Sequence, residues 1–141
     1  MNTLAVNLHL LMAGFYRPSG GRSKIVIERQ AFPSDRYAAA SQIRWHGLNP
    51  AEHLVEIGAD DTALIDESEL ESYLETHGER VALVLWPGVQ YASGQAFDLA
   101  RVTRAAHAAG AMVGLDLAHA IGNSPLSLHR DGPDFAAWCT Y

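Results

Sequence analysis

Apolar and polar residues follow two different spacings along the chain, and these spacings predict alternating helices and strands. Leu4, Leu8, Leu11 and Phe15 recur three or four residues apart, which is typical of one face of a helix over residues 3–15. Short apolar or β-branched runs are typical of strands in a sheet that is covered on both faces. The strands expected from these runs span residues 24–28, 53–57, 81–86, 111–115 and 134–140.

Helical patterns occupy the stretches between these runs. One helix is expected to run from Ser34 or Asp35, either of which suits an N-cap, to about Trp45. Residues 66–69 resemble a capping box before another helix, and Gly110 ends a third. Because strand and helix alternate throughout, the sequence predicts an α/β fold with a mostly parallel sheet and helices on both of its faces.

Composition narrows the possible functions more than it changes the expected fold. Of the 141 residues, 48% are hydrophobic and 18% charged, which is a globular composition. The net charge of −6 argues against a nucleic-acid partner, which would favour a basic face. No apolar run approaches the roughly 18 residues of a membrane span, and the single cysteine, Cys139, suits the cytoplasm. Because the chain opens inside a helical pattern and stops after an apolar run, we expect residues 1–141 to be part of a domain truncated at both ends.

The end of the run 111–115 is the most informative stretch for function. This run delivers Asp116 to the carboxyl edge of the sheet, where open α/β sheets bind ligands, and His119 follows three residues later. A carboxylate buried there suits a cationic ring nitrogen, with which it makes a charge-assisted hydrogen bond. The alternatives are a helix cap beside a structural histidine, and a metal site. We assign no residue to a metal, because the other histidines lack a matching ligand spacing.

Further candidates are expected at the same edge. Phe32 can stack on a flat ligand or pack as a hydrophobic staple on the following helix, and Asp35 shares its loop. The N–H groups at the helix start, residues 1–5, can receive a phosphate. With Asp116, these features are what a pyridoxal phosphate site needs. The one lysine, Lys24, begins a strand and is badly placed for a covalent bond to that cofactor.

Longer motifs give a more specific interpretation, and they follow one another in unbroken order. They are AFPSD at 31–35, HGLN at 46–49, PGVQY at 87–91, DLAHAIGN at 116–123 and DFAAWCTY at 134–141. The last two together are the most specific. In these motifs the chain resembles the kynureninases over essentially its whole length.

The resemblance implies a homodimeric fold type I pyridoxal phosphate enzyme of tryptophan catabolism. Its reaction is hydrolysis of L-kynurenine, 3-hydroxykynurenine or both to the corresponding anthranilate and L-alanine. By position, Asp116 pairs with the cofactor's ring nitrogen and His119 lies near its phenolic oxygen, while Phe32 stacks on the ring beside Asp35. The residues that the resemblance assigns to the phosphate are Leu4, Ala5 and Tyr141.

The resemblance places no catalytic residue within the chain, because the family's Schiff-base lysine comes immediately after the position of Tyr141. We therefore expect the isolated chain to be inactive. Ala5 stands where family members carry threonine, and Pro87 where some carry serine, which removes polar contacts to the phosphate. Two alternatives are a cysteine desulfurase-like enzyme, which tends to carry glutamine in place of His119, and a non-catalytic truncated module.

Overall fold

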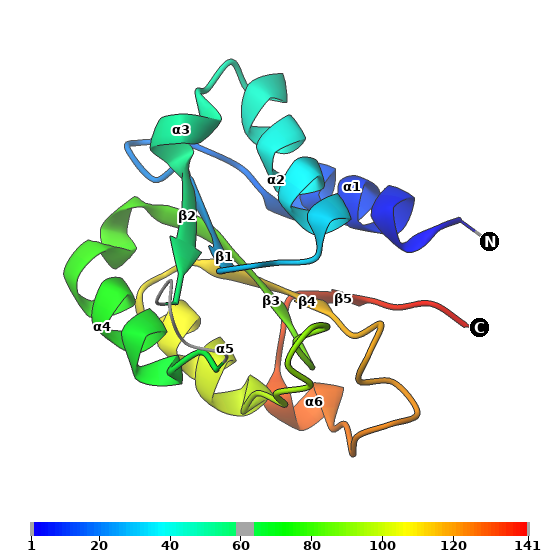
Figure 1. Ribbon diagram of the computed structural model, residues 1–141. Helices are drawn as coiled ribbons and strands as arrows, with labels where there is room; N and C mark the ends of the chain where they lie inside the picture. The colour runs from blue at the N-terminus through cyan, green and yellow to red at the C-terminus, as the bar shows by residue number, and fades with distance from the viewer. Residues whose placement is uncertain (1, 59–63, 141) are drawn as a thin grey trace.

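A single parallel sheet forms the centre of the molecule (Figure 1). The computed structural model describes residues 2–58 and 64–140 of the chain. Within these ranges the sheet has five strands in the order β2-β1-β3-β4-β5, and each neighbouring pair is parallel. The strands are β1 (Lys24–Glu28), β2 (Leu54–Ile57), β3 (Val81–Pro87), β4 (Met112–Asp116) and β5 (Phe135–Ala137).

Helices cover both faces of this sheet, as the alternating pattern predicts. Helices α1 and α2 pack on one face, while α4 and α5 pack on the other (Figure 1). No helix within the described ranges combines the length and the apolarity needed to cross a membrane. The helices are α1 (Leu4–Phe15), α2 (Pro33–Trp45), α3 (Pro50–His53), α4 (Glu67–His77), the 3-10 turn η1 (Gly78–Arg80), α5 (Leu99–Ala108) and α6 (Leu128–Asp131).

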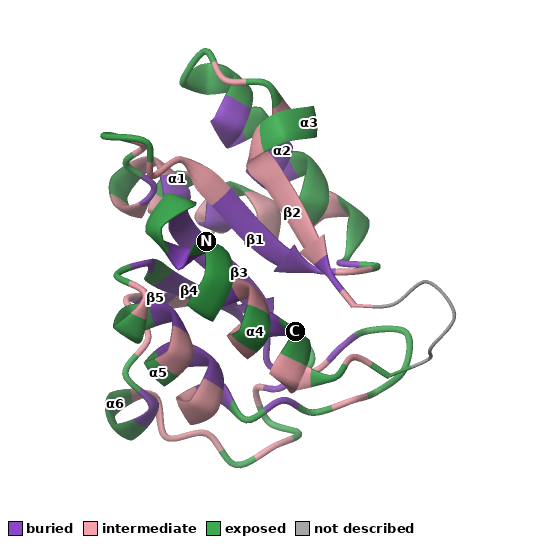
Figure 2. Cartoon of the chain, turned by 90° about the vertical axis from the view of Figure 1, so that its left-hand side faces the viewer, coloured by how far each residue is buried: buried purple, intermediate pink, exposed green. Residues whose placement is uncertain are grey.

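The core lies on the two faces of the central strands. All seven residues of β3 are buried, which explains why its sequence is apolar without alternation. Along β1, Ile25 joins the cluster beneath α1 and α2, while Val26 joins the cluster beneath α4 and α5. Burial is concentrated in the central strands, whereas β2 is mostly of intermediate burial and the outer sides of the helices are exposed (Figure 2).

Three details differ from the sequence-based expectations. The last strand was expected over residues 134–140 but spans only Phe135–Ala137, because β4 ends at Asp116 and leaves the following residues no strand to pair with. The short helices α3 and α6 were not predicted, since four residues are too few to show a helical period.

The direction of α1 matters for the functional site. Phe15, in the last turn of α1, contacts Phe135 at the start of β5, with ring centroids 5.1 Å apart. Asn7, nearer the start of the helix, shares a hollow with Trp138 and Thr140, which follow the end of β5. Helix α1 therefore runs antiparallel to the strands, and its N-terminus lies at their carboxyl edge.

Candidate functional site

Three buried carboxyl groups meet at the carboxyl edge of the sheet. Glu28 ends β1, Asp35 lies in the first turn of α2, and Asp116 ends β4; they are 5%, 6% and 7% exposed. The backbone N–H of Ala118 donates to Asp116 Oδ1 at 2.8 Å, and Ser34 Oγ donates to Asp35 Oδ1 at 3.1 Å. The side chains of Asp35 and Asp116 also interact, and this interaction raises the pKa of Asp35. We call Glu28, Asp35 and Asp116 the carboxyl cluster.

Two members of the carboxyl cluster, Glu28 and Asp35, are protonated more readily than ordinary acidic side chains. Burial raises the pKa of Asp35 to about 8, and the neighbouring Asp116 contributes to the rise. Burial likewise raises the pKa of Glu28 to about 8, with smaller contributions from Asp35 and Asp116. With a pKa of about 8, Asp35 holds a proton at neutral pH. A cation at this edge would favour the ionised forms instead.

The prediction that Ser34 or Asp35 caps α2 is wrong. The N-cap position is Phe32, which makes no side-chain capping bond, and Pro33 is the first helical residue. Proline suits that position, because its fixed φ fits the helix and it has no N–H to satisfy. Asp35 is therefore inside the first turn, where its carboxyl group reaches Asp116 instead of the helix end.

The aromatic ring of Phe32, in the loop that leads to Asp35, is partly exposed. Its side chain is 41% exposed and belongs to neither buried core cluster. Its ring contacts Tyr91 edge-to-face, with centroids 5.1 Å apart and planes at 82°. The hydrophobic-staple alternative needs the aromatic residue one position before the cap, whereas Phe32 occupies the cap itself. The position of Phe32 therefore does not match the staple alternative, and its ring stays exposed.

The positions of the remaining predicted site residues are less well defined by contacts. His119 is exposed in the turn after β4, and its imidazole has no hydrogen-bond partner among the described residues. Leu4 and Ala5 form the first turn of α1, after the N-cap Thr3, and both are half-buried. Tyr141 lies outside the described residues. The structure therefore brings Phe32 and the carboxyl cluster together, and α1 adds a helix N-terminus at the same edge.

Glu28 was not expected among the residues of this edge, and Gln90 was noticed only as part of the PGVQY motif. Glu28 ended an otherwise apolar strand, and that position at a carboxyl end could have drawn attention to it. Gln90 seemed to belong to a simple turn, but its side chain is only 3% exposed and bonds to several backbone groups. Within the described part of the chain, no group of three His, Cys, Asp or Glu residues is arranged to hold a metal ion.

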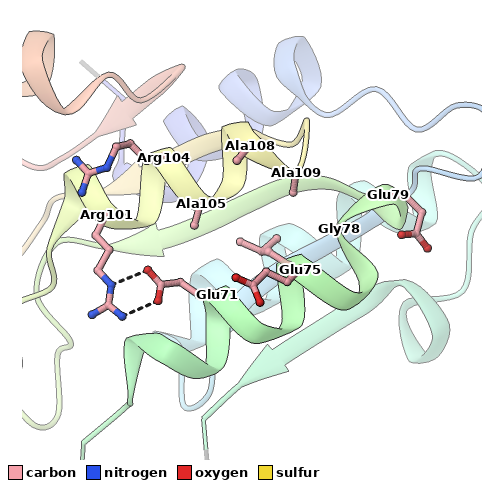
Figure 3. Close-up of a pocket in the computed structure, with 10 residues that line it drawn as sticks. Glu71, Glu75, Gly78, Glu79, Arg101, Arg104, Ala105, Ala108 and Ala109 are labelled. Carbon is pink, nitrogen blue, oxygen red and sulfur yellow. Dashed lines mark hydrogen bonds and ion pairs between the residues drawn. The ribbon is translucent and has the colours of Figure 1, made fainter.

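One hollow of the described surface lies elsewhere, between α4 and α5 (Figure 3). It has a volume of about 630 Å³, and its lining includes Gly78, Ala105 and Ala108. No predicted site residue lines it. It is therefore a groove between two covering helices rather than part of the carboxyl edge.

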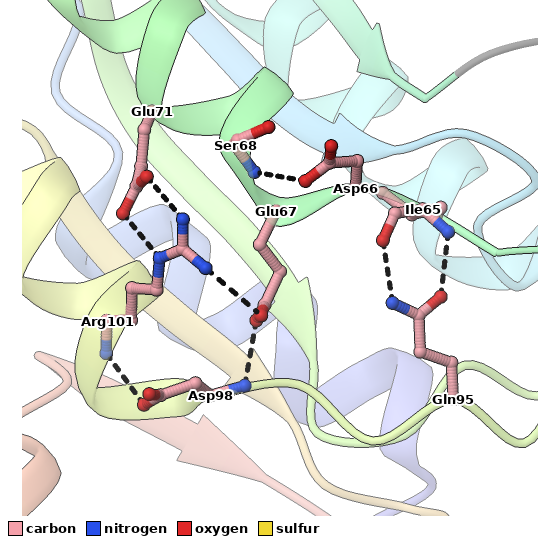
Figure 4. A network of polar contacts seen from close by, with 8 residues as sticks. All are labelled: Ile65, Asp66, Glu67, Ser68, Glu71, Gln95, Asp98 and Arg101. Carbon is pink, nitrogen blue, oxygen red and sulfur yellow. Dashed lines mark hydrogen bonds and ion pairs between the residues drawn. The ribbon is translucent and has the colours of Figure 1, made fainter.

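A polar network holds α4, α5 and the loop before α5 together (Figure 4). The Arg101 guanidinium donates to both carboxylate oxygens of Glu71 at 2.6 Å, which lowers the pKa of Glu71. The side-chain amide of Gln95 accepts from the Ile65 N–H at 2.8 Å and donates to the Ile65 carbonyl at 2.7 Å. These contacts anchor one side of the loop that follows β3.

An all-parallel sheet with buried carboxyl groups, an exposed aromatic ring and a helix N-terminus at its carboxyl edge defines an α/β protein of the cofactor-binding class. More specifically, the fold is part of the large domain of fold type I pyridoxal phosphate enzymes, as predicted. Residues 7–140 match the family Aminotransferase class-V, and the chain belongs to this family.

Comparison with relatives confirms the resemblance to kynureninases. The chain is 60% identical over 142 residues to a kynureninase of Xanthomonas axonopodis pv. citri (strain 306). It is 59% identical over 144 residues to a kynureninase of Xanthomonas campestris pv. campestris (strain B100). In both comparisons the alignment includes 100% of this chain and 34% of the relative. The chain therefore spans about a third of the length of these relatives.

Solved structures support the fold. A cysteine desulfurase from Thermococcus onnurineus NA1 superposes with a TM-score of 0.76 and 21% identity, over 96% of this chain and 32% of that one. An alanine–glyoxylate aminotransferase from Nostoc sp. superposes with a TM-score of 0.72 and 19% identity, over 97% of this chain and 33% of that one. At these identities the likeness concerns the fold alone.

Proposed function

We propose that the whole protein is a kynureninase, which hydrolyses L-kynurenine, 3-hydroxykynurenine or both with pyridoxal phosphate as cofactor. The observation that carries this proposal is the 60% identity to a kynureninase over the full chain. This identity is far above the 21% identity to the solved cysteine desulfurase and the 13% identity to a solved ureidoglycine-glyoxylate aminotransferase. Both share the fold and are named for other reactions. The products would be the corresponding anthranilate and L-alanine.

The residues of the carboxyl edge fit this cofactor. Burial is the first cause of the raised pKa of Asp35 and Glu28, and nearby carboxyl groups raise both further. A protonated pyridine nitrogen is a cation that such carboxyl groups would bind well. Asp116, held by the Ala118 N–H, would bind that nitrogen, with Asp35 beside it.

The other proposed contacts follow from where the residues lie. The exposed ring of Phe32 would cover one face of the cofactor ring. The first turn of α1, at Leu4 and Ala5, would bind the phosphate through backbone N–H groups and the partial positive charge of the helix end. His119 would lie near the phenolic oxygen, and Tyr141 would add a hydrogen bond to the phosphate.

When bound, the cofactor supplies an electron sink for the carbon–carbon bond cleavage. The task of Asp116 is to keep a proton on the ring nitrogen, because a buried carboxylate stabilises the cationic form of its partner. The task of Asp35 is to hold the proton that Asp116 shares when no cation is present and to release it when the cation binds. Phe32 keeps the ring in one plane and excludes water from that face.

The covalent anchor for the cofactor is not among residues 1–141. Lys24, the one lysine, lies at the amino edge of the sheet, where its Nζ donates to the Glu52 carbonyl at 3.2 Å. Its position at the start of β1 supports the expectation that Lys24 does not take this role. We propose that the anchoring lysine follows the position of Tyr141, as the resemblance implies, and that the whole protein acts as a homodimer in the cytoplasm.

The test is turnover of L-kynurenine by the whole protein, followed by the appearance of anthranilate with and without added pyridoxal phosphate. Wild-type protein is expected to release anthranilate and L-alanine in equal amounts, and Asp116→Asn to lose this activity. L-cysteine serves as the control substrate, because the fold is shared with desulfurases. Sulfide release from cysteine without anthranilate release from kynurenine would contradict the proposal.

A further inference from the structure

Gln90, in the loop after β3, has a buried side chain that links two separate loops of the carboxyl edge. Its Oε1 accepts from the N–H groups of Ala92 and Ser93, at 2.6 and 2.9 Å, which closes its own loop. Its Nε2 donates to the Gln30 carbonyl at 3.0 Å, across to the loop after β1. A 3% exposed amide with both ends bonded is a fixed connection rather than a surface contact.

The carbonyl that receives this bond belongs to an unusual residue. Gln30 has a φ of +56°, the one positive φ of a non-glycine residue in the described part of the chain. A residue with a side chain rarely adopts this left-handed conformation without support from its surroundings. Here it reverses the chain between the end of β1 and the start of α2, and thereby sets the direction in which Phe32, two residues later, leaves the sheet.

The two linked loops also meet through their aromatic rings. Tyr91 follows Gln90 directly, and its ring contacts Phe32 edge-to-face at 5.1 Å. Phe32 is thus held in two ways. Gln90 fixes the backbone near Phe32 through the Gln30 carbonyl, and the Tyr91 ring contacts the Phe32 ring. A 41% exposed ring would otherwise sample several rotamers.

We propose that Gln90 is a positioning residue of the cofactor site, which fixes the Phe32 ring for stacking through the Gln30 carbonyl and the adjoining Tyr91. This inference rests on the proposed function. The side-chain amide of Gln90 is occupied by its bonds within the protein, and its proposed effect passes through Phe32. Replacing Gln90 should therefore alter how the cofactor is held, and this effect should depend on the presence of the aromatic ring.

The same loop offers a matched control. Gln95 also uses both ends of its amide, to bond the N–H and carbonyl of Ile65, but these bonds lead to α4 and away from Phe32 (Figure 4). Gln90→Met and Gln95→Met each remove one side-chain amide at nearly constant volume from one loop. A merely structural role predicts similar consequences for the two variants.

The experiment uses the holoenzyme of the whole protein and measures the Kd for pyridoxal phosphate and the circular dichroism of the bound cofactor. Gln90→Met is expected to raise the Kd about tenfold and to halve the dichroism per bound cofactor, whereas Gln95→Met leaves both within twofold. In a Phe32→Leu background, Gln90→Met is expected to change the Kd by less than twofold. Tyr91→Leu, a surface change that leaves every Gln90 bond intact, is expected to raise the Kd about threefold.

Three results would overturn the positioning role. They are equal effects of Gln90→Met and Gln95→Met on the bound cofactor, an undiminished effect of Gln90→Met in the Phe32→Leu background, and, if Gln90→Met fails to fold, an unchanged Kd and dichroism in Tyr91→Leu. Wild-type protein that binds no pyridoxal phosphate would instead contradict the proposed function itself, so the two failures are distinguishable.

Discussion

The two edges of the sheet handle charge in opposite ways. At the amino edge, Arg22 Nη1 donates to three backbone carbonyls, those of Gly78, Val81 and Ala109, at 2.8, 2.6 and 3.0 Å. These carbonyls lie at the C-terminal ends of α4 and α5 and at the start of β3, where a positive group is favourable. At the carboxyl edge, buried carboxyl groups meet one another instead, and two of them have pKa values raised to about 8.

This contrast sets the amino edge, whose polar groups bond one another, apart from the edge that we propose to bind the cofactor. The amino edge satisfies its polar groups internally; besides Arg22, Tyr16 donates from its hydroxyl to the Ser23 carbonyl at 2.7 Å, and Ser23 Oγ lies 2.9 Å from His53 Nδ1. The carboxyl cluster consists of buried acidic groups whose ionised forms a bound cation would stabilise. Substitutions at the amino edge should therefore change the free energy of unfolding, and those at the carboxyl edge should change cofactor binding.

The largest effect is expected for Asp116→Asn. An amide cannot make the charge-assisted bond to a protonated ring nitrogen, so the affinity of the whole protein for pyridoxal phosphate should fall roughly 100-fold, about 3 kcal/mol. Equilibrium dialysis measures this affinity. Asp66→Asn is the control, because Asp66 only caps α4 at the surface. Equal affinities for wild type and Asp116→Asn would remove Asp116 from the site.

Arg22→Ala should have the next largest effect, and on a different quantity. It leaves three carbonyls to water in a half-buried place, which should lower the free energy of unfolding by about 2 kcal/mol. Urea denaturation of the whole protein measures this change, with cofactor affinity as the second readout. A variant that keeps its stability but loses cofactor affinity would reverse the roles of the two edges.

The raised pKa values of Glu28 and Asp35 should make the free energy of unfolding depend on pH. Folding raises the pKa of Glu28 from 4.5 and of Asp35 from 3.8, each to about 8. Between these values the folded apoprotein therefore holds protons that the unfolded chain has lost. The contribution of the two groups to the free energy of unfolding is full below about pH 4, falls as the pH rises and is lost above about pH 8. The slope is at most about 1.4 kcal/mol per pH unit for each group. Urea denaturation between pH 5 and 9 measures it, on the apoprotein.

The variant Glu28→Gln tests how much of this pH dependence comes from Glu28. The variant should lose the part of the pH dependence that Glu28 contributes while keeping the part that belongs to Asp35. An apoprotein whose stability rises from pH 5 to pH 8 would show that these groups are ionised in the folded state, contrary to their raised pKa values.

The smallest effect is expected for Ala5→Thr. Ala5 lies in the first turn of α1, and threonine there would add a hydroxyl to the proposed phosphate contacts. One added hydrogen bond is worth about 1 kcal/mol, so the affinity for pyridoxal phosphate should rise roughly fivefold. Val6→Thr, one position further along the same helix, serves as the comparison. A similar gain in both variants would point to helix stabilisation rather than phosphate binding.

The sequence predicted the architecture well because the strongest patterns lie in the elements that build it. The expected strand over residues 24–28 agrees with β1, and the apolar run 81–86 agrees with β3 to within one residue. Asp116 was correctly placed at a carboxyl edge, since any residue that ends a parallel strand must lie there. Periodicity is local, so it was sufficient for these statements.

The parts that the sequence did not predict depend on contacts between distant segments. The interaction between Asp35 and Asp116 joins the first turn of α2 to the end of β4, and it depends on Asp35 lying inside the helix that Phe32 caps. Gln90 and Gln30 lie 60 positions apart, and nothing in either stretch signals that their loops meet. Burial of Glu28 likewise follows from its neighbours in the sheet and not from its own strand.

The central claim is that the carboxyl cluster holds a proton that cofactor binding displaces. Calorimetry of pyridoxal phosphate binding to the whole protein at pH 7, in buffers with different enthalpies of ionisation, counts the protons released. We expect wild type to release about one proton more than Asp35→Asn, because the raised pKa of Asp35 falls when a cationic ring pairs with Asp116. Equal proton counts for the two proteins would contradict this claim.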